Sequence, residues 1–385
     1  MNTAVSFCGV DIMFGMRIPE ALAMLDAGAS RSDILSKTGT VLGAAGANLE
    51  IAEGQISVLM GLSGSGKSTL LRGVNGLNRV TRGSILVRHA GQDVDVVTCS
   101  ADTLRRLRQQ TVAMVFQQFA LLPWRTVADN VGLGLEYSGV PEAERKERVA
   151  RQLKLVGLDQ WAGKHAHELS GGMQQRVGLA RAFATEAPIL LMDEPFSALD
   201  PLIRTKLQDE LLELQAKLKK TIIFVSHDLE EALKIGNCIT IMEGGRIVQS
   251  GQPEDIILNP VDDYVREFIA NVNPLSVLTA WNVMDHLSDL EMDGDGWIWL
   301  DVARTTKIQL DNDRKLLAAE RNGVAGTCVC CDEVETHLGS DSRPIYWARP
   351  GTSLKIVMLA IHSTDVAPVA IFDEADHFMG SIGVA

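Results

Sequence analysis

The sequence predicts an α/β fold followed by a small α+β domain at the C-terminal end. Short apolar runs of strand type alternate with segments whose aliphatic residues recur at helical spacing, as in 55–60 followed by 70–77. At 385 residues, with 46% apolar and 22% charged side chains, the chain is long enough for two or three globular domains. Residues 271–274 are typical of a linker, so we expect domains at 1–273 and 274–385.

One motif lies where the first of these strands meets its helix. It fits the phosphate-binding pattern G-x-x-x-x-G-K-[ST], and its residues are Gly61, Leu62, Ser63, Gly64, Ser65, Gly66, Lys67, Ser68 and Thr69. A strand that turns tightly into a helix aims unpaired backbone N–H groups and about half a positive charge at one point, which favours a polyphosphate. We expect Lys67 to reach the β- and γ-phosphates and the Ser68 hydroxyl to bind Mg²⁺. The alternative is a chance glycine-rich turn, and the strand–helix context argues against it.

Composition narrows the classes of partner. No apolar run approaches the roughly 18 to 20 residues of a membrane span, and the N-terminus lacks the basic region of a secretory signal. Six cysteines without framework spacing suit a reducing cytosol. The net charge is −13, of which residues 275–385 carry −9. An acidic chain argues against nucleic acid as the main partner, because phosphate backbones favour basic surfaces.

The first sixty residues predict a β-rich flap with a helical insert. We expect residues 4–16 to form an edge strand or two ending near Phe14, residues 17–38 to be helical, and 41–49 and 55–60 to be strands. Phe14 has two equally good interpretations. Its ring either stacks on an adenine base or fills the core.

The next part of the chain predicts a second polar position on the core sheet. Residues 82–87 have strand character, 88–102 a hairpin pattern, and 112–116 the pattern of a buried strand that ends at Gln117. A glutamine at the carboxyl end of a strand beside a phosphate loop is placed to contact Mg²⁺ and an attacking water. The apolar segment 119–127 predicts a docking surface, unless Phe119 and Leu121 pack internally.

A second anion-binding helix terminus follows. Residues 142–156 have the spacing of an amphipathic helix, and Ser170 is a good N-cap for a helix that runs to about Thr185. Gly171 and Gly172 expose backbone N–H groups at the start of that helix. A single site for one triphosphate does not need two such termini, so the residues alone leave the second one unexplained.

Further polar residues end two buried strands. Asp193 and Glu194 follow an apolar run that begins at Ile189, and His227 follows the run 221–225, so we expect all three at one sheet edge. A helix cap is the alternative for the acidic pair, and a structural role is the alternative for the histidine. A helix at 203–218, a hairpin at 237–249 and helical residues at 254–271 complete the domain.

The ordered motifs resemble those of the ATPase subunit of an ABC transporter. The resemblance rests on GLSGSGKST at 61–69 and LSGGMQQR at 169–176, followed by segments similar to the family's Walker B strand, D-loop and switch histidine at 189–194, 197–200 and 225–228. It implies a P-loop NTPase core with a helical subdomain at 118–185, and two ATP molecules clamped between two copies of the chain. Pro195 stands where the related subfamily of importers usually has alanine, and this departure leaves Glu194 in place.

The resemblance also implies a role for each motif residue. Glu194 becomes the general base and His227 the γ-phosphate contact, while Gln117, Ser68 and Asp193 surround Mg²⁺. Asp200 belongs to the D-loop. The residues expected at the ATP of the opposite subunit are Ser170, Gly171, Gly172 and Gln174.

A finer resemblance covers residues 10–273, including the insert at 17–38. Stretches such as LLRGVNGLNRVTRG and SALDPLIRTKLQDELLELQ are similar to bacterial importers of quaternary amines, the glycine betaine, proline betaine and choline class. This implies a peripheral ATPase at the cytoplasmic face of the inner membrane, with a permease docked near 118–140, a periplasmic or lipid-anchored binding protein acting indirectly, and no nucleic acid. The alternative is a soluble ABC ATPase in translation or DNA repair, which a second nucleotide domain or a long coiled coil would favour. The sequence has neither.

Residues 274–385 carry weaker signals and are expected to form a regulatory domain. The segments 368–372 and 378–382 flank an acidic turn as in a hairpin, and the pair resembles the final strands of a degenerate CBS module. Four tryptophans are expected in a core, with an aromatic cage for a quaternary ammonium as the alternative: Trp281, Trp297, Trp299 and Trp347. A metal site is a further possibility for a group of three cysteines and a histidine, which are Cys328, Cys330, Cys331 and His337. Their spacing is not that of a metal site, so the three cysteines are expected to be ordinary thiols.

Overall fold

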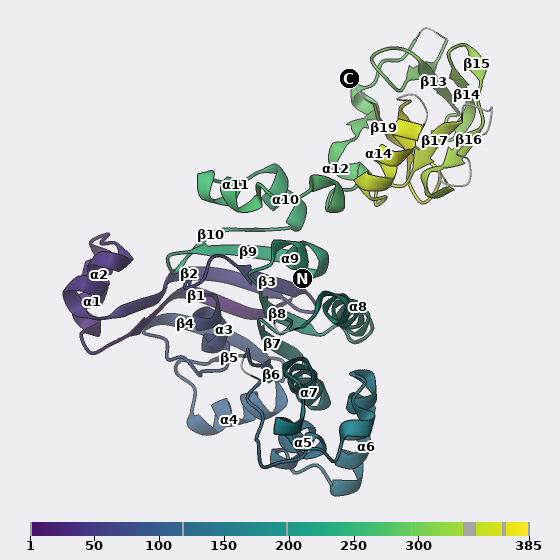
Figure 1. Ribbon diagram of the computed structural model, residues 1–385. Coiled ribbons are helices and arrows are strands. Elements are labelled where there is room, and N and C mark those ends of the chain that lie inside the picture. The colour runs from purple at the N-terminus through teal and green to yellow at the C-terminus, as the bar shows by residue number, and fades with distance from the viewer. Residues whose placement is uncertain are drawn as a thin grey trace. The chain divides into compact units, whose positions relative to one another are not determined.

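The computed structural model describes residues 2–117, 119–197, 199–293, 295–333, 344–363 and 367–383. The chain divides into two compact units, Met1–Ala270 and Asn271–Ala385, and each has its own sheets and core (Figure 1). Among the described residues, no helix has the length and apolar character that crossing a membrane requires.

The larger unit is built on a six-stranded sheet with the order β10–β9–β3–β8–β7–β6. Every neighbouring pair is parallel except β10 and β9. Its strands are β3 (Ile56–Met60), β6 (Val112–Val115), β7 (Ile189–Asp193), β8 (Thr221–Val225), β9 (Cys238–Glu243) and β10 (Arg246–Gly251). Because the carboxyl ends of parallel strands lie along one edge of a sheet, this edge collects the phosphate loop, Gln117, Glu194 and His227.

A four-stranded antiparallel sheet, ordered β2–β1–β4–β5, forms the flap. Its strands are β1 (Thr3–Phe14), β2 (Val41–Ala52), β4 (Arg82–His89) and β5 (Gln92–Asp95). The prediction of an edge strand at 4–16 is wrong, because β1 pairs with β2 on one side and with β4 on the other. The alternation of apolar residues along a strand reports which face is buried, and it does not report how many neighbours the strand has.

The helical insert consists of two helices, α1 (Ile18–Asp26) and α2 (Arg31–Thr38). They are separate because Ser30 caps α2, its hydroxyl accepting a hydrogen bond from the backbone N–H of Asp33 at 3.1 Å. Their apolar faces pack on the end of the flap in a small cluster that contains Ala21, Leu25, Ile34, Met13, Leu42 and Ala45.

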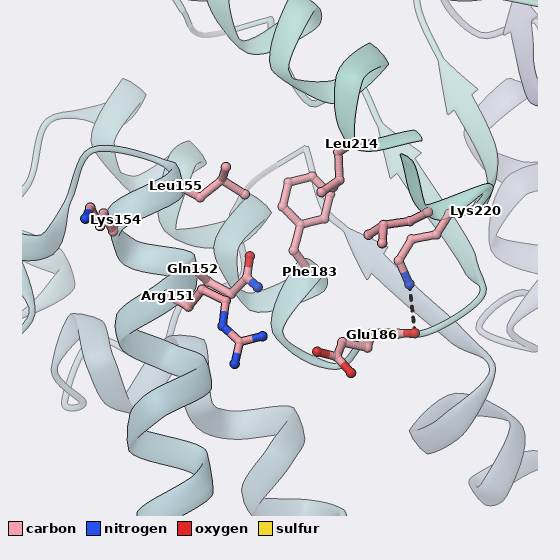
Figure 2. A pocket seen from close by; sticks show the side chains of 9 residues that line it. Arg151, Gln152, Lys154, Leu155, Phe183, Glu186, Leu214 and Lys220 are labelled. Carbon is pink, nitrogen blue, oxygen red and sulfur yellow. Dashed lines mark hydrogen bonds between the residues drawn. The ribbon is translucent and has the colours of Figure 1, made fainter. Parts of the chain in front are cut away.

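The helical subdomain contains α5 (Val127–Tyr137), α6 (Glu142–Leu155) and α7 (Gly171–Ala184), which share one apolar cluster. A cleft of about 740 Å³ lies between α6, the end of α7 and α8 (Pro201–Leu218) of the core (Figure 2). Its apolar walls come from Leu155, Phe183, Leu214 and Leu218, and its polar residues are Arg151, Gln152, Lys154, Glu186 and Lys220.

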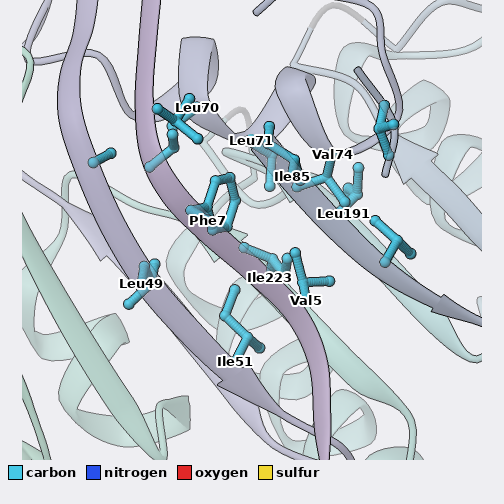
Figure 3. Packing of buried hydrophobic residues seen from close by; sticks show 14 of the residues in the cluster. Val5, Phe7, Leu49, Ile51, Leu70, Leu71, Val74, Ile85, Leu191 and Ile223 are labelled. Carbon is cyan, nitrogen blue, oxygen red and sulfur yellow. The ribbon is translucent and has the colours of Figure 1, made fainter. Parts of the chain in front are cut away.

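Two apolar clusters cover the two faces of the six-stranded sheet. Alternate side chains of each strand enter opposite clusters, so Leu191 faces the flap while Leu190 and Met192 face away from it. The first cluster joins β7 and β8 to β1, β2, β4 and α3 (Lys67–Val74) (Figure 3). The second packs under α7, α8 and α9 (Leu229–Ile235). The remaining helices of this unit are α4 (Ala101–Gln110), α10 (Pro253–Leu258) and α11 (Asp263–Ile269).

The smaller unit contains two sheets, ordered β11–β19–β18–β17–β16 and β12–β13–β14–β15. The predicted hairpin is confirmed, because β18 (Val369–Phe372) and β19 (Phe378–Ile382) pair antiparallel with Val369 opposite Ile382. The likeness to a CBS module stays a prediction. The other elements are α12 (Ala280–Val283), β11 (Asp285–His286), β12 (Trp297–Trp299), β13 (Thr306–Leu310), β14 (Leu316–Arg321), β15 (Val324–Ala325), β16 (Cys328–Cys330), β17 (Ile345–Ala348) and α14 (Leu354–Ser363).

Three of the four tryptophans of this unit lie close to cationic side chains of the same chain. The Lys307 ammonium lies 4.3 Å from the ring centroid of Trp297 and 5.5 Å from that of Trp299, and the Arg349 guanidinium lies 4.7 Å from that of Trp347. Trp281 instead packs edge-on against His286. His337 lies outside the described residues, and the described part of the chain contains no cluster of three or more potential metal ligands.

Candidate nucleotide-binding site

The phosphate loop joins β3 to α3 and is held against two other parts of the core. A Cβ atom at Gly61 would lie 2.1 Å from the carbonyl oxygen of Met242, and one at Gly66 would lie 2.2 Å from that of Gly43. Both positions therefore require glycine for close backbone approach. The backbone N–H of Gly245 also donates to the carbonyl oxygen of Ser65 at 3.0 Å. The loop is thus fixed by β2 on one side and by the β9–β10 turn on the other.

Lys67 begins α3 and is buried inside this loop. Its ammonium donates to the carbonyl oxygens of Gly61 at 2.8 Å and Leu62 at 3.1 Å, so two of its three protons are engaged by the loop. Burial lowers the pKa of Lys67, while the charges of Glu194 and Asp193 act in the opposite direction.

Ser65 supplies a further free polar atom in the same loop. Its hydroxyl is buried and has no hydrogen-bond partner among the described residues. A hydroxyl without a partner and a cation bound only to backbone carbonyls are the groups that a polyphosphate ligand satisfies. Among the other predicted loop residues, Ser63 and Gly64 lie exposed at the tip, and Thr69 lies in the first turn of α3.

Asp193 ends β7 as a fully buried carboxylate. One of its oxygens accepts from the Ser68 hydroxyl at 2.7 Å, and the other accepts from Arg72 Nε at 3.1 Å and Nη2 at 2.8 Å. Two of the three predicted Mg²⁺ ligands, Ser68 and Asp193, are therefore adjacent. Hydroxyl and carboxylate oxygens are the hard ligands that Mg²⁺ prefers, so this pair fits the ion.

Arg72 is a site residue that sequence reasoning missed. A signal was present, since Arg72 follows Ser68 by four residues and so lies on the same face of α3. Its guanidinium pairs with the buried carboxylate at 2.8 Å and offsets its charge.

Gln117, Glu194 and His227 meet at a single carboxylate oxygen. The Gln117 amide donates to Glu194 Oε2 at 3.0 Å, and His227 Nδ1 lies 3.4 Å from the same oxygen. These residues follow β6, β7 and β8, so the parallel order of the strands explains why they converge. The Glu194 side chain is 18% exposed and that of His227 is 62% exposed, so water reaches both.

The backbone at Glu194 is strained. Its φ angle is +47°, a left-handed conformation that costs a side chain-bearing residue about 1–2 kcal/mol. The surrounding turn holds it there, because the Glu194 N–H donates to the Val225 carbonyl at 3.1 Å and the Ser197 hydroxyl donates to the Glu194 carbonyl at 3.0 Å. Strain of this kind is found preferentially at functional positions.

Phe14 lies at the end of β1 beside the phosphate loop. A Cβ atom built on Gly43 would lie 2.9 Å from the Phe14 ring and 2.7 Å from the methyl group of Thr69, so these two side chains flank the same glycine. The ring is 42% exposed. This position leaves a ring face available for a nucleotide base, and the stacking role of Phe14 stays a prediction.

The second anion-binding terminus is the start of α7. Ser170 caps this helix, accepting from the backbone N–H of Met173 at 3.4 Å, and both Ser170 and Gly171 are exposed. Gln174 donates to the Leu169 carbonyl at 3.1 Å, and Gly172 is half-buried. Among the hydrogen bonds between described residues, none joins this terminus to the phosphate loop of the same chain.

Two further polar residues lie near the turn that holds Glu194. Asp200 is exposed and caps α8, accepting from the Ile203 N–H at 3.0 Å. Gln175, which sequence reasoning missed, is buried and donates to the Glu194 carbonyl at 3.4 Å. This bond links α7 directly to the turn that holds Glu194. No sequence signal distinguished it from its neighbour Gln174.

Comparison with known proteins agrees with this geometry. Residues 44–197 match the family model described as ABC transporter. The chain is 45% identical over 313 residues to the glycine betaine transport ATP-binding protein OpuAA of Bacillus subtilis, covering 80% of this chain and 74% of OpuAA. It is 50% identical over 271 residues to the glycine betaine/proline betaine transport system ATP-binding protein ProV of Escherichia coli, covering 70% of this chain and 67% of ProV.

Solved structures give the same result for the larger unit. A dimeric bacterial ABC transporter cassette superimposes with a TM-score of 0.56 and 29% sequence identity, covering 65% of this chain and 98% of that cassette. The same cassette in a post-hydrolysis state bound to ADP and phosphate superimposes with a TM-score of 0.56 and 30% identity.

Proposed function

The chain belongs to the ATP-binding subunits of ABC transporters, which hydrolyse ATP, and from this premise we propose that it energises the uptake of a quaternary amine such as glycine betaine, proline betaine or choline. Relatives named for glycine betaine and choline transport support the substrate class. The observation that carries the catalytic part is the convergence of Gln117 and His227 on one oxygen of Glu194 beside the phosphate loop.

The phosphate loop binds the triphosphate of ATP in this proposal. The backbone N–H groups of residues 63–69 and the ammonium of Lys67 hold the phosphate oxygens. Ser68, Asp193 and Gln117 hold Mg²⁺, and Phe14 stacks on the adenine ring. Bound Mg²⁺ supplies positive charge that offsets the charge on the phosphate oxygens during transfer. Binding requires Lys67 to exchange its contacts with the Gly61 and Leu62 carbonyls for phosphate oxygens.

Glu194 acts as the general base of hydrolysis. Its carboxylate, which is partly exposed, accepts the proton of the attacking water. Gln117 holds the carboxylate and orients the water by its amide group. His227 contacts the γ-phosphate from the neighbouring strand end.

A second copy of the chain completes each site. Ser170 and the N-terminus of α7 are exposed and unoccupied by any group of the phosphate loop in their own chain, so they are available to an ATP held by another chain. The similar cassette, which was solved as a dimer, supports this arrangement. Gly171, Gly172, Gln174 and Asp200 lie at this interface in the proposal.

A membrane permease docks on the helical subdomain at the cytoplasmic face of the inner membrane. The segment 119–127 contains Trp124, which is 72% exposed, whereas Leu121 packs against the subdomain core, so the docking role falls to part of the predicted segment. The cleft in Figure 2 adds an apolar groove between Leu155 of α6, Phe183 of α7 and Leu214 of α8. An amphipathic helix of the permease fits such a groove, because burying its apolar face satisfies both surfaces. A substrate-binding protein reaches this chain only through the permease.

Reconstitution tests the proposal. The chain, co-expressed with a candidate quaternary-amine permease, is expected to copurify with it, and its ATPase rate in proteoliposomes is expected to rise with glycine betaine, proline betaine, choline or carnitine in the presence of the binding protein. Leu155→Asp, which places a charge in the cleft, is expected to abolish copurification, and Leu258→Asp, at an exposed leucine of α10 that does not line the cleft, serves as the matched control. Failure of every quaternary amine to stimulate turnover in an intact complex would exclude the substrate class.

A further inference from the structure

We propose that Arg31, at the start of α2 in the helical insert, is a positioning residue that holds the tip of the phosphate loop in its nucleotide-binding shape. This inference rests on the proposed nucleotide site. The Arg31 guanidinium donates from Nη1 to the carbonyl oxygen of Gly64 at 2.5 Å. The two residues are 33 positions apart and belong to different layers, the insert and the core sheet.

The loop needs support at this point because its tip lacks the packing of its flanks. The flanking glycines, Gly61 and Gly66, press against backbone carbonyls of other strands. At Gly64, by contrast, a Cβ atom would meet nothing within 4 Å, and the residue has a φ angle of +79° that glycine adopts without strain. A glycine in open space is free to leave the conformation that aims its neighbours' N–H groups at a phosphate. The bond from Arg31 restrains that freedom.

The insert is built firmly enough to act as a support. Ile34, one turn after Arg31, is fully buried in the cluster between α1, α2 and the flap. At the end of α1, the Asp26 carboxylate pairs with Arg82 at 2.8 Å, and Arg82 also pairs with the buried Asp11 of β1 at 2.6 Å. The insert is therefore anchored to the flap by the apolar packing of both helices and by the ion pair at the end of α1, and α2 itself is held by the packing of Ile34.

Arg31 also brings a permanent positive charge to a loop that binds a polyanion. A guanidinium within hydrogen-bond distance of the loop backbone adds attraction for phosphate in addition to holding the loop. Removing it is expected to weaken nucleotide binding about 5- to 10-fold, which lies within the range for the loss of one ordinary intramolecular hydrogen bond.

Equilibrium titration of the full-length chain with MgADP, which avoids turnover, tests the inference. Arg31→Ala is expected to bind MgADP about 5- to 10-fold more weakly than wild type, and Arg31→Lys to lie between the two. Added methylguanidinium is expected to restore part of the affinity of Arg31→Ala. The matched control is Arg17→Ala, because Arg17 belongs to the same insert and donates to a backbone carbonyl at 3.0 Å, but that carbonyl is Lys37 within the insert.

The outcomes separate this inference from the nucleotide site itself. If Arg31→Ala binds MgADP within twofold of wild type while Lys67→Ala does not bind, the site stands and the role of Arg31 is excluded. The role is also excluded if Arg17→Ala weakens binding as much as Arg31→Ala, or if methylguanidinium rescues nothing, since both results indicate a general effect on the insert. Equal thermal unfolding midpoints without nucleotide for the three arginine variants and wild type are part of the expected result. If Lys67→Ala retains affinity, the nucleotide site is wrong.

Discussion

Replacing Glu194 by glutamine removes one negative charge from the proposed catalytic position with almost no change in shape. In the structure, the carboxylate accepts one hydrogen bond, from Gln117 at 3.0 Å, and lies 3.4 Å from His227. The amide oxygen of a glutamine can take the place of this oxygen and accept the same bond. The Glu194→Gln variant is therefore expected to keep the local geometry and lose the proton acceptor.

The magnitudes follow from these contacts. A hydrogen bond to a charged acceptor contributes about 1.5–3 kcal/mol and one to a neutral acceptor about 0.5–1.5 kcal/mol, so the fold loses about 1–1.5 kcal/mol. A general base contributes about 10²- to 10⁴-fold to the rate of the chemical step. The variant is thus expected to remain folded, to bind ATP as tightly as wild type, and to hydrolyse it at least about 100-fold more slowly.

Phosphate release under saturating ATP measures the rate, and an equilibrium titration measures the affinity. The matched control is Glu186→Gln, because Glu186 also has a left-handed backbone, with φ of +56°, and lies before β7 at the opposite end of the strand. This control is expected to turn over ATP at the wild-type rate. Wild-type turnover by Glu194→Gln would refute the general-base assignment and leave Gln117 or His227 to orient the water unaided.

Three further predictions concern the rest of the site. We expect the variants Ser170→Arg and Lys67→Ala each to be inactive in ATP hydrolysis. A mixture of the two is expected to recover activity, because one of the two sites in a mixed dimer has an unchanged Lys67 and an unchanged Ser170. An inactive mixture that still dimerises would argue against sites shared between chains. Phe14→Ala is expected to weaken ATP binding by about 0.5–1.5 kcal/mol, whereas Phe14→Trp retains it, and equal affinities in titrations would remove the ring from the site. Burial lowers the pKa of Lys67 in the free chain, and a bound polyphosphate favours the ammonium form. At a pH above the lowered pKa, the Lys67 side chain is therefore expected to take up a proton when the nucleotide binds. Calorimetry in buffers of different ionisation enthalpy measures this proton uptake, and the Lys67→Arg variant is expected to show none.

The core sheet was predictable because its signals are local. Each of β3, β6, β7 and β8 is a short apolar run followed by a polar group, and the parallel pairing of such strands places those groups at one edge. The flap was less predictable. The sequence of β1 shows which of its faces is buried, but its central place between β2 and β4 depends on pairing with residues up to 82 positions away in the chain, as for Val5 and Val87. Local patterns do not contain that information.

The residues of the site also divide into those that local sequence motifs located and those that only the fold revealed. The loop glycines, Lys67 and the acidic pair belong to short motifs, so sequence alone located them, although their individual roles are untested and stay predictions. Arg72, Gln175 and Arg31 act through one or two hydrogen bonds to backbone or side-chain atoms that are distant in the sequence. An arginine or glutamine on a helix surface is common, and its partner is known only when the fold is known. The clefts and supports of the site were for this reason not predictable from the sequence.

In the proposed assembly, helix α7 provides a physical connection between the nucleotide and the permease. It begins at the exposed terminus capped by Ser170, contacts the turn that holds Glu194 through Gln175, and ends beside the cleft that Phe183 lines. At 14 residues it is about 21 Å long, and a hydrogen-bonded helix of this length moves as a rigid body. An element inserted into the cleft therefore displaces the opposite end of the same helix, where the second chain's ATP binds in the proposal. Conversely, closure of the dimer around ATP moves Phe183. Because the coupling between two sites is reciprocal, a permease that favours the closed dimer must itself be driven by ATP binding.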